Sequence, residues 1–153
     1  MPEPIDLFIS YSHKDADLCD ELKTHLTLLK RQGLVRLWHD GDIQAGSTWN
    51  NEIHKNLESA RIILLLVSAN FLASDFIHEV ELKRALERHD EGSARVIPII
   101  VKACDWTAAP FAALQALPRD GKAVATYRDR DAAWTEVARA LRGILEMAPA
   151  AGP

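Results

Sequence analysis

The clearest hydrophobic pattern in the chain is an unbroken apolar run from Ile62 to Val67. A run this short, with no polar alternation, is typical of a strand buried on both faces inside a parallel sheet. The polar residues Ser68 to Ser74 predict a turn, and Asp75 is the expected N-cap of the helix that follows. The chain is therefore organised around a buried strand, a turn and a helix.

That helix carries a candidate functional carboxylate. Glu81 lies four residues after Ile77 and four before Ala85, so it shares a helical face with apolar neighbours. Open parallel sheets bind ligands outside the carboxyl ends of their strands, and this helix begins just beyond such an end. The pattern also allows an ordinary explanation, in which Glu81 forms a solvated pair with Arg84 or Arg88.

Four further short apolar segments predict strands, and helical spacing predicts the elements between them. The strands are Ile5–Ser10, Leu34–Trp38, Arg95–Val101 and Lys122–Thr126. Apolar residues at helical spacing are Leu18, Leu22, Leu26 and Leu29; Trp49, Ile53 and Leu57; and Trp134, Val137, Ala138, Leu141 and Leu145. Gly33 is expected to end the first helix. Pro98 lacks a backbone donor and places its strand near a sheet edge or a bulge.

Strands that alternate with helices predict right-handed crossovers and a doubly wound α/β fold. We expect a single flavodoxin-like domain over residues 1–147, with a five-stranded parallel sheet of order 2-1-3-4-5 and helices on both faces. Its ligand crevice would lie between the loops Ser10–Asp15 and Ser68–Asp75. Residues 148–153, APAAGP, are interpreted as a linker or tail that leads to a further domain.

Composition narrows the class of protein. The 153 residues carry a net charge of −4 without a basic stripe, which argues against direct binding of nucleic acid. The apolar runs are shorter than the roughly 20 residues that span a bilayer, and MPEPIDLF lacks the features of a signal peptide. We therefore expect a cytoplasmic protein that does not enter a membrane.

Cysteine and histidine usage gives no sign of a metal site. Cys19 and Cys104 have no CxxC spacing and suit a reducing compartment, where both are expected to be structural. The six histidines are scattered, without an HExxH motif. No metal and no resident cofactor are expected.

Common chemistries of five-stranded α/β domains are also disfavoured. The loop SYSHKD after the first strand has no glycine, unlike a flavin phosphate loop. Ser10 and Ser68 stand where a phosphoacceptor receiver domain needs acidic residues for Mg²⁺. The chain contains no GxxxxGK[ST], GxGxxG or GxSxG motif.

Three segments stand in order along the chain: DLFISYSHKD at Asp6–Asp15, VRLWHDGDIQAGSTW at Val35–Trp49, and RIILLLVSANFLASDF with VELKRAL from Arg61 to Leu86. Together they resemble the TIR (Toll/interleukin-1 receptor) domains, particularly the bacterial ones. The resemblance covers about the whole chain, and several motifs in the right order are more specific than any one alone.

The resemblance implies a set of site residues. Glu81 matches the glutamate required by those TIR domains that cleave NAD⁺ to nicotinamide and ADP-ribose products. The implied substrate cleft is lined by Ser10, Tyr11, Asp40, Trp49 and Ile77. Many NAD⁺-cleaving members have an aromatic residue where this chain has Ile77.

The residues alone leave other roles open for part of this set. Trp49 lies at helical spacing with Ile53 and Leu57 and can belong to the core. Ser10 and Tyr11 can donate to a ribose or phosphate or stabilise a turn, and Asp40 can simply shape the loop through its Asp-Gly pair.

The resemblance further implies self-association through the loop His39–Ser47, the so-called BB loop. The expected contact residues are Asp42, Ile43, Gln44 and Gly46. Partners would then be NAD⁺, other TIR domains in a homo-oligomer or filament, and a linked or separate sensor domain.

Two functions of different classes follow. The first is an NAD⁺ glycohydrolase (an NADase) that cleaves NAD⁺ to nicotinamide and ADP-ribose or a cyclic ADP-ribose isomer. It would be activated by self-association and act as an effector of bacterial antiphage defence. The second is a non-catalytic TIR scaffold or adaptor. The presence of Glu81 and the bacterial style of the motifs favour the enzyme over the scaffold and over a nucleoside-processing relative.

Overall fold

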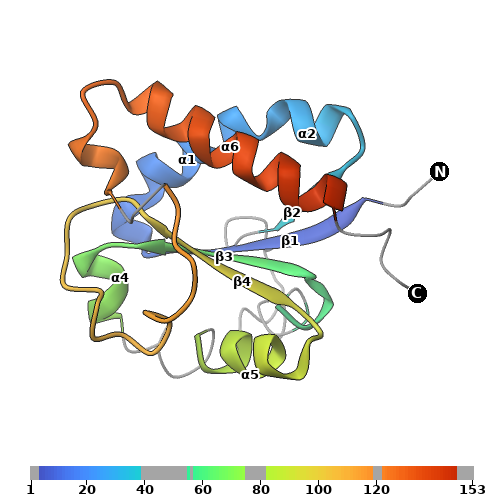
Figure 1. The fold of residues 1–153 in the computed structure, drawn as a ribbon, viewed down its shortest axis with the longest axis horizontal. Coiled ribbons are helices and arrows are strands. Elements are labelled where there is room, and N and C mark those ends of the chain that lie inside the picture. Colours follow the sequence, from blue (N-terminus) through green and yellow to red (C-terminus); the bar gives the residue numbers. More distant parts are fainter. Residues whose placement is uncertain (1–3, 39–54, 56, 75–81, 119–121, 148–153) are drawn as a thin grey trace, which may run out of the picture.

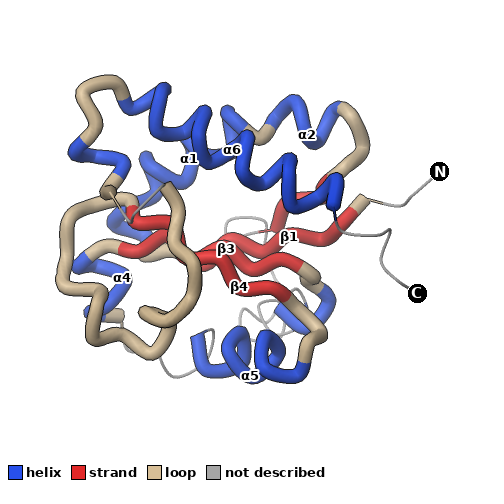
Figure 2. The backbone as a smooth tube through the Cα atoms, viewed as in Figure 1, coloured by secondary structure: helices blue, strands red, loops and turns tan. Residues whose placement is uncertain are grey.

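A parallel sheet forms the centre of the molecule (Figures 1 and 2). The computed structural model describes residues 4–38, 55, 57–74, 82–118 and 122–147. Within them the sheet has four parallel strands in the order β2-β1-β3-β4. The strands are β1 (Ile5–Ser10), β2 (Val35–Trp38), β3 (Ile62–Val67) and β4 (Arg95–Ile100).

Helices cover both faces of this sheet, as the alternating pattern predicts (Figure 1). On one face lie α1 (Ala16–His25), α2 (Thr27–Arg31) and α6 (Arg130–Met147). The other face carries α4 (Ala69–Ala73), α5 (Lys83–Glu91) and a helical segment at 57–59. Two short 3-10 turns, η1 (His13–Asp15) and η5 (Val124–Thr126), lie in the connections.

The core consists of two clusters separated by the sheet. The first packs Leu7, Ile9 and Leu64 against the leucines of α1 and α2 and against Trp134 of α6. The second packs Phe8 against Leu57, Phe71, Leu82 and other residues of the opposite face. Every residue of β3 is buried, which confirms the prediction of a central strand covered on both sides.

The first predicted helix is divided in two. Leu26 lies between α1 and α2, but the four leucines of the predicted face are all buried. Gly33 follows α2 with a φ of 73°, the left-handed conformation that glycine adopts without steric cost. The predicted helix end at this glycine is confirmed.

The predicted turn at Ser68–Ser74 is wrong, because residues Ala69–Ala73 form α4. The Ser68 side chain accepts a hydrogen bond from the Phe71 N–H at 3.0 Å and caps this helix. The ring of Phe71 packs edge-on against Phe111 at 6.2 Å between centroids. A serine directly before a helix is a capping signal, and the apolar Phe71 supplies the buried face.

The predicted fifth strand at Lys122–Thr126 is also wrong. Its last three residues form η5, in which both the N–H and the hydroxyl of Thr126 donate to the Ala123 carbonyl. These local bonds satisfy groups that a strand would give to a neighbour. Leu117 instead forms an isolated bridge to Ile99 of β4.

The described sheet therefore ends at β4, so the predicted order 2-1-3-4-5 is corrected to 2-1-3-4, and Pro98 lies on an edge strand, one of the two positions that it allowed. The carbonyl of Pro98 accepts from the Leu117 N–H on the outer side of the strand. The backbone nitrogen of Pro98, which carries no hydrogen, therefore lies on the side of β4 that faces away from β3.

Candidate functional site

The carboxyl ends of three adjacent strands meet at one edge of the sheet. Ser10 at the end of β1 is in register with Leu65 of β3, and Val67 of β3 is in register with Ile100 of β4. Ser68 follows β3 directly, and Lys102 lies two residues beyond β4. This edge is where an open parallel sheet binds its ligands.

A buried carboxylate ties these strand ends together. Asp15, at the end of η1, has no exposed surface. It accepts a hydrogen bond from the Ser68 hydroxyl, one from the Asn70 amide at 3.2 Å and one from the Lys102 ammonium at 2.9 Å. We call these four residues the Asp15 network. It links the loop after β1, the start of α4 and the end of β4.

The charges in this network stabilise each other. Burial acts to raise the pKa of Asp15, but the hydrogen bonds from Ser68, Lys102 and Asn70 outweigh it and hold the pKa below 3.8. The hydrogen bond to Asp15 raises the pKa of Lys102. Both groups are ionised at neutral pH, although Lys102 remains 43% exposed and Asp15 is enclosed.

Ser10 presents a buried hydroxyl at the same strand ends. Its residue is 1% exposed, and its Oγ has no hydrogen-bond partner among the described residues. Side chains alternate along a strand, so Ser10 lies on the same sheet face as Phe8, the face that α5 covers. A buried hydroxyl without a partner is uncommon and marks a position where a ligand or water can bond.

Tyr11, the second predicted donor, lies on the opposite face. Its side chain is 9% exposed and belongs to the cluster beneath α1 and α6. Its ring lies 6.1 Å from that of His13. The structure therefore does not bring the side chains of Ser10 and Tyr11 together, which the sequence had assigned to one cleft.

Most of the predicted site lies outside the described residues. These positions are the catalytic candidate Glu81, the expected cap Asp75, the cleft residues Asp40, Trp49 and Ile77, and the association residues Asp42, Ile43, Gln44 and Gly46. The residue after Glu81 is described: Leu82 is 2% exposed and packs in the same core cluster as Phe8 and Leu65.

The two arginines proposed as simple partners of Glu81 have other partners. Arg84 contacts Glu58 through two hydrogen bonds of 2.5 and 2.8 Å and Glu87 through one of 3.2 Å. Arg88 is 6% exposed and donates to the carbonyls of Leu57 and Ala60. The prediction of a solvated Arg88 is wrong, and burial lowers the pKa of its guanidinium.

Sequence reasoning did not identify Asp15 or Lys102 as members of the strand-end cluster. Asp15 bonds to Ser68 and Lys102 across 53 and 87 residues of chain, so no local pattern links them. The available signal was topological, since parallel strands place the residues after their carboxyl ends side by side.

Two other classes of site find no support in the part of the chain that the structure describes. No group of three His, Cys, Asp or Glu side chains there is arranged to hold a metal ion. None of the described helices is both long and apolar enough to cross a membrane. Neither Cys19 nor Cys104 forms a disulfide, and burial raises the pKa of the Cys104 thiol.

Comparisons with known proteins agree with this architecture. The family model described as "TIR domain" matches residues 7–142. Protein y4lF of Sinorhizobium fredii is 50% identical over 136 residues, which are 89% of this chain and 42% of that protein. The chain thus spans less than half the length of this relative.

Two solved structures share the fold. The TIR domain of the Toll-related receptor TRR-2 from Hydra magnipapillata has a TM-score of 0.63 at 18% identity, and the match covers 89% of this chain and 97% of that one. The TIR domains of the activated Roq1 resistosome, which directly recognises the pathogen effector XopQ, have a TM-score of 0.50 at 22% identity, covering 67% and 61%. With a family match over most of its length and a parallel α/β sheet of this order, the chain belongs to the TIR domain family.

Proposed function

We propose that this TIR domain is an NAD⁺ glycohydrolase in which Glu81 is the catalytic carboxylate. The observation that carries the proposal lies at the carboxyl ends of β1, β3 and β4. There a buried Ser10 hydroxyl has no partner among the described residues, on the sheet face where Leu82, the neighbour of Glu81, also packs. Perturbed and unsatisfied polar groups concentrate at functional sites.

The chemistry needs one carboxylate. Cleavage of the bond between nicotinamide and ribose develops positive charge on the ribose, as in other glycosidic cleavages. A fixed carboxylate stabilises that charge or orients the ribose hydroxyls. Nicotinamide leaves as a neutral molecule and needs no general acid. Water then gives ADP-ribose, and an internal nucleophile gives a cyclic isomer.

The Asp15 network supports this site by holding its scaffold. Asp15 connects the loop after Ser10 to Ser68 and Asn70 at the start of α4. The segment that contains Glu81 runs from the end of α4 to Leu82, so both of its flanks are anchored in described structure. The network therefore fixes the start of α4, the helix that precedes this segment.

The partners of Arg84 and Arg88 also favour a functional Glu81. Arg84 is engaged by Glu58 and Glu87, and Arg88 by backbone carbonyls. The alternative in which Glu81 serves only to pair with one of these arginines is therefore disfavoured. In the proposed cleft, Ser10, Asp40, Trp49 and Ile77 contact NAD⁺, whereas Tyr11, whose side chain lies on the other sheet face, is not part of it.

We further propose that activity requires association between copies through the loop 39–47, with Asp42, Ile43, Gln44 and Gly46 at the contact. The Roq1 TIR domains belong to an activated resistosome, and that fold likeness supports an assembly here. Protein y4lF is longer than its matched region, which fits the proposal that a further domain, such as a sensor, is linked to the TIR domain. A role as an effector of bacterial defence remains part of the proposal. Clustering by such a domain raises the local concentration.

The scaffold is the second candidate, favoured by the likeness to a receptor TIR domain. The test is chromatography of NAD⁺ and its products with wild type and Glu81→Gln, each free and clustered on a multivalent support. Glu91→Gln is the matched control, because Glu91 is 57% exposed on α5 and loses the same charge. The enzyme predicts nicotinamide release by wild type and Glu91→Gln but not by Glu81→Gln.

Two results would contradict the enzyme. Equal turnover by Glu81→Gln and wild type would remove Glu81 from the chemistry. No turnover by clustered wild type, with association intact by light scattering, would favour the scaffold.

A further inference from the structure

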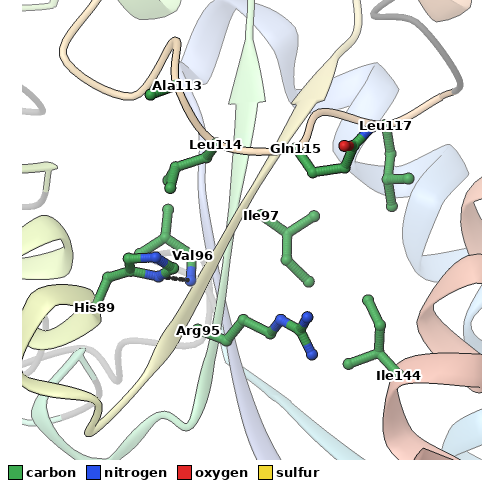
Figure 3. Close-up of a pocket in the computed structure, with 9 residues that line it drawn as sticks. All are labelled: His89, Arg95, Val96, Ile97, Ala113, Leu114, Gln115, Leu117 and Ile144. Carbon is green, nitrogen blue, oxygen red and sulfur yellow. Dashed lines mark hydrogen bonds between the residues drawn. The ribbon is translucent and has the colours of Figure 1, made fainter.

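A pocket of about 290 Å³ lies at the outer edge of β4, between the segment 113–117 and α6 (Figure 3). Its apolar wall includes Ile97 of β4, Leu117 and Ile144 of α6. Figure 3 shows the guanidinium of Arg95 and the amide of Gln115 on either side of Ile97. The pocket therefore combines an apolar middle with polar groups at its ends.

The pocket exists because the edge of β4 is only partly covered. Leu117 bonds to the backbone of Pro98 and Ile100 in the second half of the strand. In the described residues no strand pairs beside the first half, from Arg95 to Ile97, where a fifth strand would have lain. Ile97 and Ile144 are left as the walls of a hollow.

The first half of this edge offers no free backbone N–H to an added strand. The Val96 N–H donates to Nδ1 of His89 at 3.1 Å, and Pro98 has no N–H. The Pro98 carbonyl already accepts from the Leu117 N–H. A peptide that pairs with an edge strand needs such groups. Binding in the pocket therefore depends mainly on the side chains that line it.

Charge indicates the kind of occupant. Among the described residues, several arginines, such as Arg36 and Arg84, pair with a carboxylate, and others, such as Arg139, do not. Arg95 differs from all of them in lining this pocket. Arg95 is exposed and has no carboxylate partner among the described residues, and the Gln115 amide has no hydrogen-bond partner among them. An unpaired guanidinium is a fork of donors that matches a carboxylate.

We propose that this pocket binds a small organic monoanion with an apolar body, such as an aryl-substituted short-chain carboxylate. The carboxylate bonds to Arg95, and the apolar body packs on Ile97, Leu117 and Ile144. A cavity of about 150 Å³ accepts benzene, so about 290 Å³ has room for a ring and a short acid chain. Gln115 can donate to a second oxygen of the ligand.

The pocket is separate from the strand-end edge. Arg95 begins β4 and Lys102 lies beyond its other end, a distance along the strand of about 20 Å at the usual rise per residue. Binding here can be measured without any turnover. The proposal therefore stands or falls independently of the proposed NADase activity.

The experiment is a titration of isotope-labelled protein with 4-phenylbutyrate, followed by amide chemical shifts. The neutral analogue 4-phenylbutan-1-ol has the same apolar body and serves as the ligand control. Arg95→Gln removes the charge in the pocket. Arg139→Gln removes the same charge from an exposed position on α6 that does not line the pocket, and is the matched protein control.

We expect shifts of the Val96, Ile97, Gln115 and Leu117 amides with the acid. The affinity should fall about tenfold in Arg95→Gln and stay unchanged in Arg139→Gln. The alcohol should bind about tenfold more weakly to wild type and equally to both variants. Equal affinity for acid and alcohol, an equal effect of the two substitutions, or no shift of these amides at about 10 mM acid would overturn the proposal.

Discussion

Asp15→Asn is expected to destabilise the domain in a manner that depends on pH. The carboxylate has no exposed surface and accepts from three donors: Ser68, Asn70 and Lys102. Asparagine keeps the shape but has no charge and one acceptor oxygen. If that oxygen keeps Asn70 and Lys102, the NH₂ group faces the Ser68 hydroxyl, which must turn from donor to acceptor. The network therefore loses its charge-assisted hydrogen bonds at neutral pH.

The magnitude follows from the kinds of bond. A hydrogen bond to a charged group contributes roughly 1.5–3 kcal/mol, and a buried group left without a partner costs roughly 1–3 kcal/mol. Lys102 is 43% exposed and can bond to water when its partner is neutral, so the loss of its hydrogen bond lies at the low end of the first range. We expect a loss of about 2 kcal/mol at pH 7, or a fall of about 4–8 °C in Tm for a domain of this size.

The pH dependence has a definite sign. The pKa of Asp15 in the folded state lies below the ordinary value of 3.8. Its ionised form therefore contributes stability that is fully present above about pH 4 and is lost as the pH falls through the folded pKa. The difference between wild type and Asp15→Asn should be constant from pH 7 to about pH 4 and shrink below it.

The assay is urea unfolding at several pH values between about 3 and 7, with the buried Trp134 as a fluorescent reporter. Asp20→Asn is the control, because Asp20 is 75% exposed and its contact with Lys23 is 3.7 Å. That substitution should change stability by less than about 0.5 kcal/mol. A destabilisation by Asp15→Asn that equals the control, or that persists unchanged at about pH 3, would refute the role of the Asp15 carboxylate.

Three further predictions concern other parts of the domain. Arg88→Met should lower the free energy of unfolding, measured in urea, by about 2–4 kcal/mol, because it leaves two buried carbonyls without their donor. A loss no greater than that caused by Arg84→Met would contradict this. Gly33→Ala should lower the free energy of unfolding by about 1 kcal/mol. An added Cβ would meet no atom within 4 Å, but a φ of 73° strains the backbone of any residue with a side chain. An unchanged Tm would show that the turn relaxes. Ile43→Asp should keep the specific NADase activity low at every protein concentration while that of wild type rises; a flat wild-type profile would mean that the monomer is competent.

Local sequence pattern was sufficient for most secondary structure. The apolar run Ile62–Val67 and the segment Ile5–Ser10 predicted β3 and β1 with the bounds that the structure has. Both are short, strongly apolar and flanked by polar residues, so hydrophobic burial leaves them a single arrangement. The buried face of α6 was likewise evident from the spacing of Trp134, Val137 and Leu141.

Prediction was weaker where competing local bonds decided the outcome. At Lys122–Thr126 the apolar residues allowed a strand, but Thr126 closes a tight turn onto Ala123. At Ser68–Ser74 the capping hydroxyl of Ser68 permits a helix in a segment that composition had favoured as a turn. The alternatives differ by one or two hydrogen bonds, a difference that composition does not resolve.

By itself, then, the sequence determined the α/β class, the buried central strand and the family through its ordered motifs. Only the tertiary structure decided that Asp15 bonds to Ser68 and Lys102, that Arg88 is buried against carbonyls, and that Ser10 and Tyr11 lie on opposite faces. The physical reason is the separation along the chain over which each effect acts. Hydrophobic periodicity acts between near neighbours in the chain, whereas a buried charge takes its partners from whichever distant segments the sheet brings to its side.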